Sequence, residues 1–210
     1  MSRLLKSFSS AEELWREADS SIMRLDLPRK LLDDFCAARR KIDVTREMDR
    51  VASAGASLIT LEDESYPRLL RSLPDRPILL YFRGALALGN ESAVAVVGTR
   101  KASRYGLDVA FELSRQLARQ GVTIISGMAH GIDAEAHRGA LDAGGKTIAV
   151  VATGIDRVYP REHIELAADI EASGAIITEM PLRSAPLGKN FPQRNRIISG
   201  LSLGVLVAEA

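Results

Sequence analysis

The stretch that decides the fold is residues 93–106, which read AVAVVGTRKASRYG. A run of small and β-branched apolar residues gives way at Gly98 to a short basic loop, and helical spacing follows. Apolar runs of this kind recur along the second half of the chain, about 25–30 residues apart. They lie at residues 93–97, 122–125, 147–151, 175–178 and 205–208.

Most of the intervals between these runs hold an amphipathic helical stretch. Such stretches cover residues 106–119, 133–143 and 161–172, and each ends at or just before a glycine. Alternation of strand and helix at this period indicates βαβ units with right-handed crossovers. The near-continuous apolar character of the strands indicates burial on both faces. We therefore predict an α/β fold, a Rossmann-like doubly wound parallel sheet.

The residues before this region have a different pattern. Residues 1–60 show helical spacing, with no glycine before Gly55, and are predicted to form a small N-terminal helical domain. Short strands are predicted at residues 58–61 and 78–82. Residues 61–91 are interpreted as an extended linker whose short strands pack on the sheet domain. Residues 92–210 then form the Rossmann-like domain.

Composition narrows the function classes. The chain of 210 residues has 28 Lys and Arg against 27 Asp and Glu, a net charge of +1, which excludes a uniformly basic polyanion binder but allows a local basic patch. The lone cysteine, Cys36, excludes an intrachain disulfide and a cysteine-based metal site, and fits a reducing, cytoplasmic compartment. The longest apolar runs are far too short to cross a membrane. We expect no metal site, no cofactor and no membrane partner.

The loops that follow the first two strands resemble phosphate-binding loops. Ligands of doubly wound sheets bind beyond the carboxyl ends of the strands, and each of these loops brings glycines and hydroxyl groups to a helix N-terminus. Neither loop is a G-x-G-x-x-G or Walker motif, so a dinucleotide cofactor is not indicated. An ordinary strand-to-helix turn with solvated basic residues is equally compatible with the first loop. The candidate binding residues are Gly98, Thr99, Arg100, Lys101, Ser103, Ser126, Gly127, His130 and Gly131.

A third candidate segment follows the fourth strand. From residue 180 to residue 207 the sequence holds no acidic residue, and Phe191 is its only aromatic side chain. An aromatic ring among basic and amide side chains is typical of a single-stranded nucleic-acid groove. In the alternative interpretation Phe191 belongs to the core and the arginines pair with distant carboxylates. The candidates in this segment are Lys189, Phe191, Arg194, Asn195 and Arg196.

Two loop carboxylates, Asp133 and Glu179, support different interpretations. As structural supports they would hold their loops through main-chain N–H groups. As an acid or base they would indicate a nucleotide-processing enzyme of the phosphoribohydrolase type. The Pro-Gly-Gly-x-Gly-Thr signature that we associate with such enzymes is absent from residues 92–210. We therefore favour the structural role and expect no catalytic residue; a plain scaffold that docks a protein partner is a third interpretation.

Taken together, these loops resemble the DNA processing protein A family, also called Smf. The resemblance runs in order through residues 55–210. It is carried by Tyr66-Pro67, Leu80-Tyr81-Phe82-Arg83-Gly84, Val97-Gly98-Thr99-Arg100, Ser126-Gly127-Met128-Ala129-His130-Gly131-Ile132-Asp133-Ala134, Tyr159-Pro160, Glu179-Met180-Pro181 and Phe191-Pro192-Gln193-Arg194-Asn195-Arg196-Ile197-Ile198-Ser199-Gly200-Leu201-Ser202.

The resemblance implies a protein that binds single-stranded DNA during natural transformation, protects it and helps load a RecA-type recombinase, working as a homodimer. It places the DNA contacts in the candidate loops. Two departures are visible. His130 stands where the family commonly has arginine, which weakens a phosphate contact or makes it pH-dependent. The chain also stops at Ala210, where the family continues, so we expect the C-terminal part of the sheet domain to be missing and the dimer surface to be damaged or absent.

Overall fold

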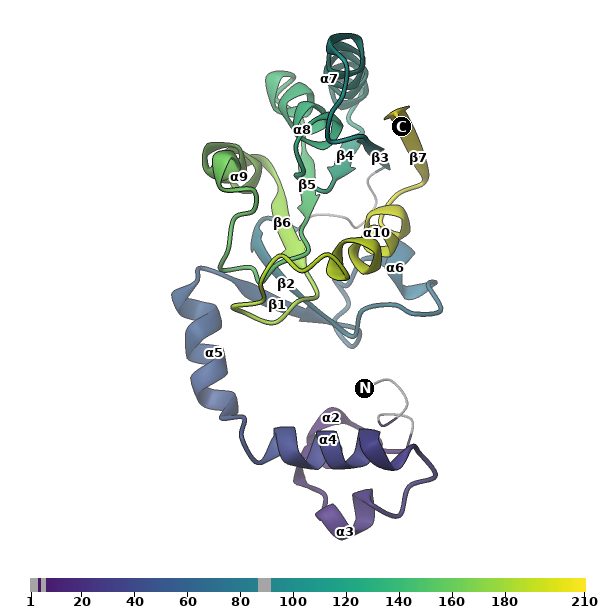
Figure 1. Ribbon diagram of the computed structural model, residues 1–210, viewed down its shortest axis with the longest axis vertical. Coiled ribbons are helices and arrows are strands. Elements are labelled where there is room, and N and C mark those ends of the chain that lie inside the picture. Colours follow the sequence, from purple (N-terminus) through teal and green to yellow (C-terminus); the bar gives the residue numbers. More distant parts are fainter. Residues whose placement is uncertain (1–3, 5–6, 87–91) are drawn as a thin grey trace. The chain divides into compact units, whose positions relative to one another are not determined.

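The computed structural model describes residues 4, 7–86 and 92–210, and the chain divides into two compact units. The units are Met1–Arg50 and Val51–Ala210, and each is described by itself. Within the described residues, no helix has both the length and the apolar character needed to span a membrane. The helices and strands of both units are labelled in Figure 1.

The first unit is built from short helices around an apolar cluster. They are α2 (Ala11–Arg16), α3 (Asp19–Ile22) and α4 (Arg29–Arg39), and α5 (Val44–Ser53) begins in this unit. The Ser10 side chain caps α2 by accepting a hydrogen bond from the Glu13 N–H. Asp19 forms ion pairs with Arg39 and Arg40. The cluster comprises Leu4, Leu14, Ile22, Leu32, Phe35 and Cys36.

The described part of the second unit contains a seven-stranded sheet in the order β1-β2-β6-β5-β4-β3-β7. The five strands β6, β5, β4, β3 and β7 pair in parallel, as predicted. In contrast, β2 pairs antiparallel with both β6 and β1. The predicted α/β sheet preceded by helices is therefore confirmed, with an antiparallel extension at one edge. The strands are β1 (Ser57–Thr60), β2 (Leu79–Gly84), β3 (Ala93–Gly98), β4 (Thr123–Ser126), β5 (Thr147–Val150), β6 (Ala175–Thr178) and β7 (Gly204–Glu209).

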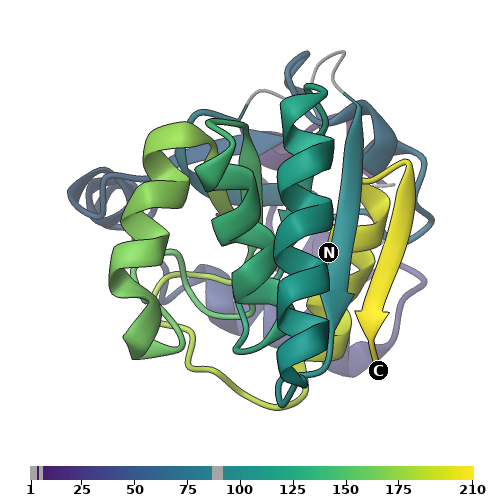
Figure 2. The same ribbon diagram turned by 90° about the horizontal axis from the view of Figure 1, so that it is seen from above.

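Helices cover both faces of this sheet. In Figure 2, α7 (Arg104–Arg119), α8 (Ile132–Asp142) and α9 (Ile164–Ser173) lie side by side over one face, and α10 (Asn190–Gly200) lies behind the other. The short elements α6 (Arg68–Arg71) and η1 (Arg161–His163) complete the unit. From β3 to β6 each new parallel strand is added on the same side of the one before it. After β6 the chain returns along α10, which crosses the opposite face, and β7 pairs with β3 on its other side. This reversal creates a topological switch point between β3 and β7.

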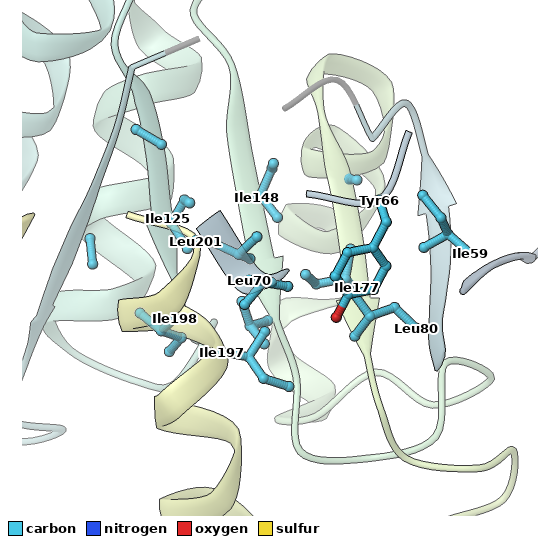
Figure 3. Packing of buried hydrophobic residues seen from close by; sticks show 14 residues of the cluster. Ile59, Tyr66, Leu70, Leu80, Ile125, Ile148, Ile177, Ile197, Ile198 and Leu201 are labelled. Atoms are coloured by element: carbon cyan, nitrogen blue, oxygen red, sulfur yellow. The ribbon is translucent and has the colours of Figure 1, made fainter. Parts of the chain in front are cut away.

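Successive side chains along a strand point to opposite faces of the sheet and therefore pack in separate cores. On β4, Ile125 packs under α6 and α10, whereas Ile124 packs toward α7 and α8. Figure 3 shows the first of these cores, where Ile197 and Ile198 of α10 face the sheet. The strand β7 differs from this pattern. It lies at the sheet edge, and Val205 and Val207 are 51% and 59% exposed, so its apolar run is not buried on both faces as the sequence predicted.

Candidate nucleic-acid interface

A cavity of about 700 Å³ lies at the carboxyl ends of β3 and β7, beside α10. This position matches the switch point, where doubly wound sheets bind their ligands. The topology thus brings the loop after β3, the loop after β4 and the first turns of α10 to one place. The candidate residues that line the cavity are Gly98, Thr99, Arg100, Asp133, Phe191, Arg194, Asn195 and Arg196.

An arginine stacked on a phenylalanine forms one wall of the cavity. The guanidinium carbon of Arg100 lies 4.8 Å from the ring centroid of Phe191, within range of a cation–π interaction. Phe191 is half-buried in the first turn of α10, and its ring centroid lies 6.0 Å from that of Tyr159. The ring is therefore accessible from the cavity and is not enclosed in the core.

Donors of the loop between β3 and α7 bind a carboxylate of the protein itself. Ser103 caps α7, and both its N–H and its hydroxyl donate to the Glu209 carboxylate, at 3.1 and 2.9 Å. The Thr99 N–H donates to the main-chain oxygen of Glu209 at 2.8 Å. A Cβ at Gly98 would approach that oxygen to 2.5 Å, so only glycine allows this close approach. The N–H and hydroxyl groups that the sequence offered to a phosphate therefore bind Glu209 instead.

The loop between β4 and α8 is held from inside. The buried Ser126 hydroxyl donates to the Val96 carbonyl at 2.6 Å. Asp133, only 6% exposed, accepts a hydrogen bond from the Ala129 N–H at 3.4 Å, and burial raises its pKa. Helix α8 has no side-chain N-cap, and the N–H of its first residue, Ile132, donates to the Thr99 carbonyl at 3.3 Å. Ser126 and Asp133 thus shape the loop, and the start of α8 is tied to the loop after β3.

Arg194 is buried beneath this loop. The side chain donates from Nη1 to the Gly127 carbonyl at 2.8 Å and to the Val150 carbonyl, and the residue is 5% exposed. Burial lowers its pKa, and the charge of Asp133 opposes that shift. A Cβ at Gly127 would collide with Nη1, which explains a glycine at this position. The structure therefore directs Arg194 toward main-chain carbonyls rather than toward the cavity opening.

Arg196 is held by acidic side chains that are distant in sequence. Its Nε lies 3.1 Å from an Asp75 carboxylate oxygen, and its Nη2 lies 2.5 Å from Glu179. The pairing partners stand outside the acid-free segment, as the alternative interpretation of that segment required. Glu179 is likewise engaged by this ion pair. Arg196 therefore braces α10 against the end of β6 and the segment before β2.

The remaining basic candidates are exposed at the rim. Lys101, His130 and Lys189 are exposed, as is Asn195. Within the described residues none of Arg100, Lys101 and Lys189 forms an ion pair with a carboxylate. These cations are consequently the ones whose charge is uncompensated near the cavity.

Two histidine rings lie side by side in the loop after β4 and in η1. His130 and His163 have ring centroids 5.0 Å apart, and the buried His163 hydrogen-bonds through Nδ1 to the Met128 carbonyl at 3.0 Å. Burial lowers the pKa of His163. Across the described part of the chain, no three His, Cys, Asp or Glu side chains gather as a metal site.

The structure thus separates the sequence candidates into distinct groups. Arg100 and Phe191 meet at the cavity wall, with Gly127 and His130 beside them around a small adjoining space. Ser103, Ser126, Arg194 and Arg196 are engaged by protein groups. Two nearby residues were absent from the sequence candidates. Tyr159 is an exposed ring next to Phe191, and Glu209 is the first acid after Glu179.

Known proteins with similar sequences and folds identify the family. The sequence model of DNA recombination-mediator protein A matches residues 57–210. Protein Smf of Synechocystis is 36% identical over 215 residues, covering 100% of this chain and 54% of that protein. The chain spans about half the length of the curated relatives it matches.

Solved structures agree with this assignment. DNA processing protein A from Streptococcus pneumoniae matches with a TM-score of 0.74 and 35% identity, over 84% of this chain and 61% of that one. The same protein from Helicobacter pylori, whose structure concerns its single-stranded DNA binding mode, matches with a TM-score of 0.65 and 31% identity. That match covers 73% of this chain and 70% of the other. The chain therefore belongs to the DNA recombination-mediator protein A family.

Proposed function

We propose that this chain binds single-stranded DNA at the cavity wall formed by Arg100 and Phe191. The observation that carries the proposal is this stacked pair, in which an unpaired cation and an accessible ring face the same space. Rings of this kind stack on bases of any sequence, and cations follow the phosphates. Lys101 and Lys189 add exposed positive charge beside this wall, and His130 is an exposed polar ring next to it.

The wider role follows from family membership. We propose that the protein protects single-stranded DNA that enters during natural transformation and helps load a RecA-type recombinase, in the cytoplasm and as a homodimer. Asp133, Glu179 and Glu209 each bind protein donors within the described part of the site. These bonds give each carboxylate a structural role, and we propose a binding function rather than hydrolysis.

The experiment that tests the DNA site is fluorescence anisotropy with a labelled oligothymidine at several salt concentrations. Arg100→Gln should lower the slope of log affinity against log salt by about 0.7, the value for one phosphate contact on a single strand. Phe191→Ala should cost about 1–3 kcal/mol and leave the slope unchanged, because a ring contributes stacking without charge. Arg119→Gln, an exposed arginine at the far end of α7, is the matched control.

Arg196→Gln provides an internal comparison. Because Asp75 and Glu179 hold Arg196, its loss should leave the salt slope as in the unaltered chain. Equal slopes for the unaltered chain and Arg100→Gln would remove the proposed site. A RecA-type ATPase assay on DNA coated with a single-strand-binding protein tests loading: the unaltered chain should raise the rate, and Phe191→Ala should not.

A further inference from the structure

A second aromatic ring stands next to Phe191 on the side away from β7. Tyr159 is 42% exposed, and its ring is tilted by 57° from that of Phe191, with the centroids 6.0 Å apart. Tyr159 lies in the loop between β5 and η1, and the buried Pro160 follows it. An exposed ring beside a half-buried one presents a second surface on which a base can stack.

The space around Tyr159 is a cavity of about 1060 Å³. A smaller space of about 30 Å³ lies between this cavity and the one beside α10, and it is lined by Arg100, His130, Tyr159 and Phe191. The small space shares Arg100 and Phe191 with the first cavity, and it shares His130 and Tyr159 with the second. The three spaces are therefore neighbours, and the two rings stand between the two larger ones.

Two arginines of the second cavity can contact a phosphate. Arg157 and Arg161 line it and are exposed, and no ion pair engages either side chain in the described residues. Asp156 and Glu162 also line it, so the charged side chains of the lining balance. An Asp156 carboxylate oxygen accepts a hydrogen bond from the Arg183 N–H at 2.8 Å, which turns Asp156 toward that loop.

We propose that this cavity is a second nucleotide subsite, in which Tyr159 stacks on a base and Arg157 and Arg161 contact the adjoining phosphates. The proposal rests on the proposed single-strand function and extends its path beyond Phe191. Because the two rings are tilted by 57°, a strand that stacks on both must bend between them. The ligand class is a single-stranded oligonucleotide long enough to cover both rings.

The test is anisotropy with oligothymidines of graded length, from about 4 to about 16 nucleotides, the range of site sizes found for single-strand binders. Affinity of the unaltered chain should rise when the oligonucleotide becomes long enough to reach Tyr159. Tyr159→Ala should lose about 5- to 150-fold on the long oligonucleotides only, as expected for one stacked base. Tyr159→Phe should keep the gain. Tyr105→Ala removes a tyrosine that is 78% exposed on α7, and serves as control.

Arg157→Gln and Arg161→Gln give an independent readout. Each should lower the salt slope by about 0.7 on long oligonucleotides and leave it unchanged on the shortest one that binds. Tyr159→Ala with unaltered affinity at every length would overturn the second subsite while leaving the first in place. An equal loss at every length would also overturn it, because Tyr159 would then only orient Phe191. Absence of binding by the unaltered chain would overturn both proposals together.

Discussion

Replacing Arg194 by methionine should destabilise the sheet unit by about 3–5 kcal/mol. Methionine retains much of the apolar stem but removes the Nη1 donor that binds the Gly127 and Val150 carbonyls. It also removes the positive charge that faces the buried Asp133. Each of the two buried carbonyls left without a partner costs about 1–3 kcal/mol, and loss of the facing charge raises the pKa of Asp133 further.

The assay is urea unfolding followed by two signals. The chain has one tryptophan, Trp15, which lies in the unit Met1–Arg50, so its fluorescence reports on that unit. Far-UV circular dichroism also reports on the sheet unit, where the loss of stability should be seen. The tryptophan midpoint should stay unchanged in Arg194→Met. Arg119→Met, at an exposed position, should change neither signal measurably.

A DNA measurement separates the structural role of Arg194 from a direct contact. Under conditions where Arg194→Met is folded, the salt slope of oligothymidine binding should equal that of the unaltered chain, because the buried guanidinium faces carbonyls. A stability loss below about 1 kcal/mol would refute the energetic reasoning. A salt slope lower by about 0.7 would show that Arg194 contacts a phosphate.

Two further predictions concern buried or acidic groups. Burial lowers the pKa of His137 to about 3 from 6.5, so its stabilising contribution is complete above pH 6.5 and is lost as the pH falls toward 3. When the pH is lowered from 7 to 5, the free energy of unfolding of the unaltered chain should therefore fall by about 2 kcal/mol more than that of His137→Gln, as measured by urea titration. Equal falls in the two proteins would contradict this. Glu209→Gln should raise oligothymidine affinity several-fold at low salt, because it removes a negative charge from the cavity. It should also lower the free energy of unfolding by about 0.5–1 kcal/mol, because Glu209 binds Ser103 at the start of α7. Unchanged affinity at low salt would count against the cavity as the binding site.

The parallel part of the sheet was predictable because each strand carries its own signal. The run at residues 93–97 is apolar throughout and the run at 147–151 is apolar after Thr147, as is typical of buried parallel strands, and the structure places strands there. The antiparallel pairing of β2 with β6 was not predicted, because it joins segments about a hundred residues apart and leaves no local pattern. The place of β7 beside β3 likewise follows from the strand order, which no single strand reveals.

The site shows the same division between local and distant information. Arg100 and Phe191 could be found because residues after parallel strands meet at one sheet edge, and their types are distinctive. The partners of Arg194 and Arg196 were not predictable, because the absence of nearby acids in sequence does not exclude carbonyls or carboxylates that folding brings close; their DNA contacts stay predictions. Asp75, which pairs with Arg196, is 121 positions earlier in the chain. Tyr159 belonged to a motif of the family resemblance, Tyr159-Pro160, but nothing in the sequence near it pointed to a ligand contact.

The pairing of β7 with β3 has a consequence for biosynthesis. On the ribosome β3, β4, β5 and β6 emerge in order, and β4, β5 and β6 can each pair with the strand made just before. Glu209 must return across 106 positions to reach Ser103. The contact between Arg100 and Phe191 therefore forms only after α10 has left the exit tunnel. The contact between Ser103 and Glu209 also waits for β7, because the chain between them must first close into a long loop. A nascent chain would carry the basic loops early but would acquire a formed cavity only when β7 docks.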